Sequence, residues 1–147
     1  MQTVYDHLIS KEVTDKILAV INSELGIKSV LTTQYFDDDK QCMVKNLYPF
    51  FGSGCGFAVI EYDRRNKMSK ALFDGREVQN EVSKYKSYLS TLFSKEVKDY
   101  YTSVGFPLTA TLGQNMVING AILTEAVEYL KKKYKITTKC YVRTIID

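Results

Sequence analysis

Hydrophobic residues recur at helical spacing in three stretches of this chain. Between residues 10 and 25, apolar side chains return every three or four positions, and Gly26 follows as a helix stop. The same spacing runs through residues 76–104, where Ser94 is placed to cap a second helix, and through residues 121–135. The pattern therefore predicts three or four amphipathic helices.

Segments rich in β-branched and aromatic residues lie between these helices and predict strands. They cover residues 27–36, 42–51, 57–63, 68–73, 108–112 and 136–146. The segment 68–73 could instead open the following helix, and residues 113–120 are expected to be irregular. Because strands that follow one another closely form hairpins, we predict an α+β fold. It would have a mostly antiparallel sheet of about five or six strands, with three or four helices packed on it.

Length and composition fit an ordinary globular protein. The chain has 147 residues, of which 45% are hydrophobic and 25% are charged. We therefore expect a single α+β domain over residues 1–147, large enough to fold without disulfides or a metal. No apolar run reaches the length of a membrane span, and the first ten residues do not resemble a secretion signal. These features indicate a soluble, cytoplasmic protein.

Few residues suited to catalysis or metal binding are present. The cysteines Cys42, Cys55 and Cys140 form no CxxC pair, and His7 is the only histidine. The spacing of a zinc site is therefore missing, and a nucleophile would have only His7 as an imidazole base. We expect no metal, no cofactor and no enzymatic activity.

The alternative is that the protein is an enzyme, and it rests on the glycine-rich run from Gly52 to Gly56. Glycines allow backbone N–H groups to surround an anion, and Cys55 within such a loop could be an activated nucleophile. The run lacks the GK[ST] of a P-loop, and it precedes a strand rather than a helix. A glycine-rich connection between strands is the simpler interpretation.

Charge is distributed unevenly along the chain. Residues 1–39 carry 3 basic and 7 acidic side chains, residues 40–147 carry 17 and 10, and the net charge is +3. Such an asymmetric molecule can steer an anionic partner.

Our leading hypothesis is a macromolecule-binding protein with a protein partner, and a homodimer is a further option. Aromatic residues that fall outside the core pattern, together with a basic loop, would form the binding face. Its candidate residues are Tyr48, Phe50, Phe51, Arg64, Arg65 and Lys67.

The second hypothesis is a nucleic-acid-binding accessory protein. Basic residues also gather near the C-terminus, with tyrosines among them that could stack on bases. This segment contains Lys131, Lys132, Lys133, Lys135, Lys139 and Arg143, with Tyr129, Tyr134 and Tyr141. Lysines at a helix end also complement the helix dipole, which is the simpler explanation for several of them.

Overall fold

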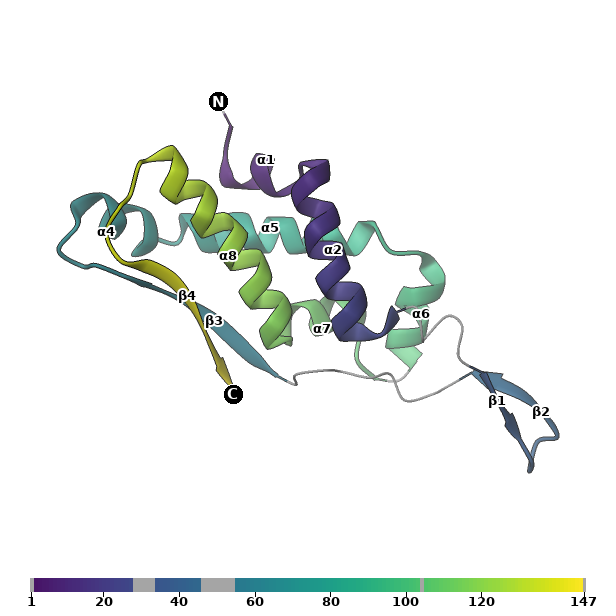
Figure 1. The fold of residues 1–147 in the computed structure, drawn as a ribbon. Helices are drawn as coiled ribbons and strands as arrows, with labels where there is room; N and C mark the ends of the chain where they lie inside the picture. The colour runs from purple at the N-terminus through teal and green to yellow at the C-terminus, as the bar shows by residue number, and fades with distance from the viewer. Residues whose placement is uncertain (1, 28–33, 46–54, 104, 147) are drawn as a thin grey trace.

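Helices dominate the part of the chain that the computed structural model describes, which is residues 2–27, 34–45, 55–103 and 105–146. Seven helices and four strands are found there (Figure 1). The helices are α1 (Val4–Leu8), α2 (Lys11–Leu25), α4 (Lys67–Phe73), α5 (Glu77–Thr91), α6 (Lys95–Ser103), α7 (Leu108–Gln114) and α8 (Met116–Lys133). The strands are β1 (Gln34–Asp37), β2 (Cys42–Lys45), β3 (Gly56–Tyr62) and β4 (Cys140–Ile146).

The predicted α+β fold with a sheet of five or six strands is wrong. The described strands form two separate antiparallel pairs, β1 with β2 and β3 with β4. Residues 68–73 and 108–112, both expected to be strands, belong to helices α4 and α7. The expected irregular segment 113–120 holds the end of α7 and the first turn of α8. Short apolar runs fit a buried strand and a helix equally well, and here the helix is formed.

Asparagine caps explain two of these helices. The Asn66 side chain accepts a hydrogen bond from the Ser69 backbone at 2.9 Å and so begins α4. Asn115 begins α8 in the same way, because its side-chain oxygen accepts from the backbone N–H groups of Val117 and Ile118, both at 3.0 Å. Each cap satisfies backbone donors that have no partner within the helix.

The predicted helices over residues 10–25 and 76–104 are confirmed, and so is the break within the second. Gly26 ends α2 with a left-handed φ of 59°, as the sequence pattern indicates. Ser94 separates α5 from α6, and its hydroxyl accepts from the Val97 backbone at 3.3 Å. Gly105 follows α6 with a φ of 87°, a conformation that glycine adopts without strain.

Helix α8 is the centre of the molecule. It packs on the β3–β4 sheet on one side and on α1, α2 and α5 on the other (Figure 1). Its buried residues include Ile118, Ile122 and Ala126. They join a continuous apolar core that also contains Leu8, Ile17, Ile21, Leu25, Tyr85, Leu89, Tyr101 and Leu112.

The β3–β4 sheet has two different faces. In the antiparallel register, Ile60 lies opposite Val142, and both pack against the core, as does Ala58. The other face carries three opposed pairs, which are Phe57 with Ile145, Val59 with Arg143 and Glu61 with Tyr141. We call this second face the outer sheet face.

The β1–β2 hairpin lies apart from the helical body, at the far end from α4 (Figure 1). Asp37 is opposite Cys42, and its carboxylate accepts hydrogen bonds from the Asp39 and Lys40 backbones within the connecting turn. These hydrogen bonds hold the turn that joins the two strands.

Candidate functional site

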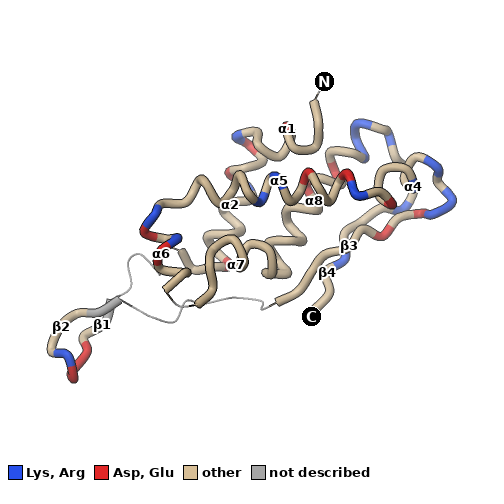
Figure 2. Tube along the Cα trace, turned by 180° about the vertical axis from the view of Figure 1, so that it is seen from behind, with Lys and Arg blue, Asp and Glu red and all other residues tan. Residues whose placement is uncertain are grey.

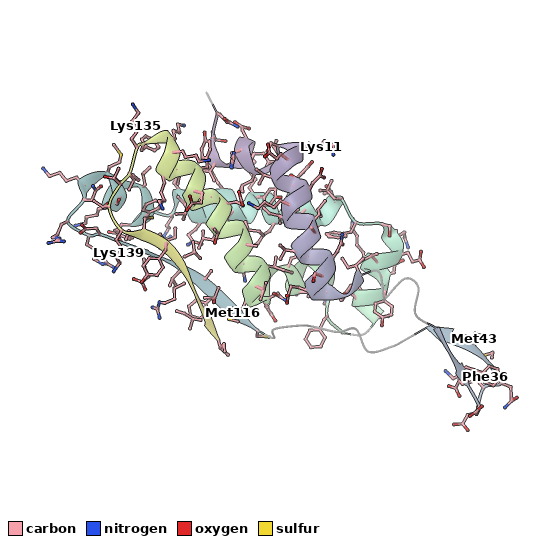
Figure 3. All side chains as sticks on the ribbon, viewed as in Figure 1. Lys11, Phe36, Met43, Met116, Lys135 and Lys139 are labelled. Atoms are coloured by element: carbon pink, nitrogen blue, oxygen red, sulfur yellow. The ribbon has the colours of Figure 1, made fainter. Side chains whose placement is uncertain are left out.

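Two basic segments that are distant in the sequence meet at one end of the molecule. The Asp63 backbone N–H donates to the Lys139 carbonyl at 3.1 Å, just beyond the end of the β3–β4 ladder. The Lys131 ammonium donates to the Cys140 carbonyl at 3.3 Å, which fixes the end of α8 beside β4. We call residues 61–74 and 128–143 the basic end. Figure 2 shows blue Lys and Arg segments gathered there around α4, and Figure 3 labels Lys135 and Lys139 on it.

Local structure holds each basic segment in place. In the turn after β3, the Asp63 carboxylate accepts from the Arg65 backbone at 3.0 Å and from its guanidinium at 3.2 Å. These hydrogen bonds lower the pKa of Asp63, so the turn keeps its charged acceptor at neutral pH. After α8 the chain reverses at Lys135, whose φ is 52°, and the Ile136 backbone donates to the Lys131 carbonyl at 3.0 Å.

The basic end carries far more positive charge than its own carboxylates neutralise. It contains ten of the 20 Lys and Arg residues but only four of the 17 Asp and Glu residues. Three of these acids are paired, in Glu61–Arg143, Asp63–Arg65 and Glu128–Lys131. Seven cations of the basic end form no ion pair with any described residue: Arg64, Lys67, Lys70, Lys132, Lys133, Lys135 and Lys139.

Tyrosine rings lie next to these cations. The Arg64 guanidinium is 5.3 Å from the centre of the Tyr62 ring, and the Lys139 ammonium is 5.7 Å from that of Tyr141. Lys133 lies at a similar distance from Tyr129 and Tyr134. Tyr134 and Tyr141 are 40% and 49% exposed. Exposed rings therefore alternate with exposed positive charge.

The structure brings together only part of the predicted binding face. Arg64, Arg65 and Lys67 lie at the basic end, where sequence reasoning had treated them as separate from the C-terminal lysines. Tyr48, Phe50 and Phe51 lie outside the described residues. The missed signal was the pairing of β3 with β4, because this ladder joins the two basic segments and no local motif encodes it.

The described residues offer little for the enzymatic alternative. Cys55 is exposed, and its sulfur is 3.8 Å from the Gln114 side-chain oxygen. Gly56 is needed for close packing, because a Cβ there would lie 2.6 Å from the Ile145 carbonyl oxygen and 2.8 Å from the Met116 Cβ. The rest of the glycine-rich run lies outside the described residues. Within the described ranges, no three His, Cys, Asp or Glu side chains are grouped so that they could hold a metal ion.

An apolar groove of about 470 Å³ runs between α2, α8 and β4. Ile17, Val20, Val117 and Val142 are among its lining residues, and the Lys16–Glu125 ion pair lies at its edge with an N–O distance of 2.6 Å. Its polar groups are this pair and threonine hydroxyls, and none of the Lys or Arg residues of the basic end lines the groove.

A scan of protein-family models finds no match to this chain, and searches of curated proteins and of solved structures find none either. Among the described residues, no helix combines the length and apolar character that crossing a bilayer requires.

Proposed function

We propose that this protein binds nucleic acid through the basic end. The observation that carries the proposal is the meeting of two basic segments in one place, with seven cations that no described carboxylate neutralises. A phosphate backbone presents a regular series of negative charges, and lysine and arginine are the side chains that neutralise it.

The charge at this end exceeds what helix stability requires. Lysines in the last turn of α8 complement its dipole, and Lys131 also binds the Cys140 carbonyl. Arg64, Lys67 and Lys139 lie outside that turn, and their charges add nothing to the dipole interaction. A polyanion spanning both segments of the basic end would contact these cations.

Charge reversal tests the proposal. Arg64→Glu, Lys132→Glu and Lys139→Glu change one cation in the first segment of the basic end and two in the second. We expect the triple variant to bind a labelled oligonucleotide at least about tenfold more weakly at physiological salt. The negative slope of log K against log salt should also become shallower, by roughly two in magnitude. Fluorescence anisotropy over a salt series measures both quantities.

The matched control reverses three cations elsewhere, by Lys11→Glu, Lys40→Glu and Lys95→Glu. Lys11 and Lys95 form exposed ion pairs with Asp15 and Asp99, which contribute little to stability. Both triple variants have the same net charge of −3. Equal loss of binding in the two variants would contradict the proposal, and so would salt-independent binding by the unmodified protein.

A protein partner remains the second candidate, and the basic end also supports it, because an acidic protein surface would be complementary to it. The two candidates differ in what competes for binding. If the same cations bind both partners, added nucleic acid should displace an acidic protein from the basic end. The surplus of positive charge at the basic end, which a phosphate backbone can neutralise, favours nucleic acid.

A further inference from the structure

The outer sheet face carries aromatic and apolar side chains that no described helix covers. Phe57 is 47% exposed and Tyr141 is 49% exposed, and they lie on opposite strands at the two ends of this face. Helix α8 packs on the inner face, and in Figures 1 and 2 no described helix lies over the outer one. Each of these exposed aromatic rings can accept a planar group.

This face is continuous with the basic end. Tyr141 lies opposite Glu61, one residue before the end of β3, and Lys139 lies over the Tyr141 ring. Arg143 occupies the middle of the face, where its guanidinium forms an ion pair with Glu61 at 2.9 Å. Glu61 is therefore neutralised within the face, and the positive charge of Lys139 and its neighbours is retained.

We infer that the outer sheet face is a stacking platform for unpaired bases, and that the basic end binds the phosphates of the same single strand. The inference rests on the proposed function, and it specifies the substrate class as single-stranded rather than duplex nucleic acid. Bases of every kind have a planar face that can stack on Tyr141 or Phe57, whereas bases within a duplex are already stacked on one another. Arg143, between the two rings, adds a planar cation to the same face.

The sequence allows a direct optical test, because the chain contains no tryptophan. In Tyr141→Trp, the single indole would report stacking at the platform. We expect its fluorescence to be quenched when oligothymidylate binds, and to change little with a duplex of equal phosphate count. The matched control is Phe36→Trp, since Phe36 is 52% exposed and lies on the β1–β2 hairpin, far from the basic end (Figure 3). Its fluorescence should not respond to either nucleic acid.

Removal of the rings measures their contribution to binding. We expect Tyr141→Ala with Phe57→Ala to weaken binding of oligothymidylate at least about fivefold and to leave duplex binding unchanged. Circular dichroism of the double variant shows whether the fold is retained. If the double variant is unfolded, the conservative Tyr141→Leu, which keeps the apolar area without the ring, replaces it.

The outcomes separate this inference from the proposed function. Salt-dependent binding of both nucleic acids, with equal affinity and with no effect of the ring substitutions, would overturn the stacking platform and leave the basic end intact. Tight duplex binding with weak oligothymidylate binding would also overturn it. Failure to bind either nucleic acid at low salt would overturn both proposals, and capture of an acidic protein through the same cations would then identify the alternative partner class.

Discussion

Two fully buried tyrosines differ in whether their hydroxyl groups find a partner. The Tyr101 hydroxyl donates to the Leu25 carbonyl at 2.6 Å, near the end of α2, and burial raises its pKa to about 12. The Tyr101 hydroxyl therefore remains protonated, and a hydrogen-bond donor, at neutral pH. The Tyr85 hydroxyl has no hydrogen-bond partner among the described residues, and the nearby Thr14 hydroxyl donates to the Leu8 carbonyl.

These tyrosines provide a matched pair of substitutions. We expect Tyr101→Phe to lower the free energy of unfolding by about 1–3 kcal/mol, because it leaves the Leu25 carbonyl unpaired in the core. Tyr85→Phe removes a buried hydroxyl without a partner and should leave stability unchanged within about 0.5 kcal/mol, or raise it. Urea denaturation of both variants measures the difference, and an equal loss in the two would show that the Leu25 hydrogen bond contributes little.

Glycine at position 56 allows β3 and α8 to approach closely. A methyl group there would meet the Ile145 carbonyl oxygen, which cannot move without disturbing the β3–β4 ladder. We expect Gly56→Ala to destabilise the protein by about 1–3 kcal/mol. Gly113→Ala is the control, because nothing lies within 4 Å of a Cβ at that exposed helical position. Alanine there should stabilise α7 by up to about 1 kcal/mol. Thermal unfolding that ranks the two variants in the opposite order would contradict this role of Gly56.

The N-terminal segment is held against α8, and its contacts make it sensitive to pH. His7 stacks on Tyr129 with ring centres 4.5 Å apart, and the Tyr129 hydroxyl and the Lys133 ammonium both donate to the Gln2 carbonyl at 2.9 Å. Burial, with a smaller contribution from Lys132, lowers the pKa of His7 below its usual 6.5.

The direction of the pH effect follows from this shift. Below about pH 6.5 the unfolded chain binds a proton at position 7 more readily than the folded one, so the contribution of His7 is complete above that pH. It is lost as the pH falls through 6.5 towards the folded pKa. The free energy of unfolding at about pH 8 and that at about pH 5 should differ less in His7→Gln than in the unmodified protein, and denaturation at the two pH values measures this difference. An identical pH dependence in both would exclude a contribution from His7.

Helices with long, regular hydrophobic spacing could be predicted from the sequence. Whether a short apolar run forms a strand or a helix could not. Helix α2 and the α5–α6 pair have several turns of consistent spacing and clear terminating residues, Gly26 and Gly105. Residues 68–73 and 108–112 are too short for their periodicity to separate strand from helix. Asn66, which caps α4, was the local signal that would have corrected residues 68–73, whereas α7 begins without a side-chain cap.

The candidate site was predicted in pieces rather than as a whole. Each basic segment was visible in the sequence, because clustered charge needs no knowledge of the fold. Their meeting depends on the pairing of Tyr62 with Cys140, which are 78 positions apart in the numbering. Such a contact follows from the packing of the β3–β4 pair on α8, and no spacing rule within either segment encodes it.

At the scale of the whole molecule, the basic end leaves the rest of the chain with a net charge of −3. The consecutive aspartates of the β1–β2 turn lie on the hairpin, far from α4 (Figures 1 and 2). The protein therefore has a permanent electric dipole moment along its long dimension, so a charged surface attracts it in one preferred orientation. A cation-exchange resin would retain it more strongly than a protein of the same net charge with evenly scattered residues. When a ligand binds at the basic end, the β1–β2 hairpin lies on the side of the protein away from that ligand, exposed to solvent.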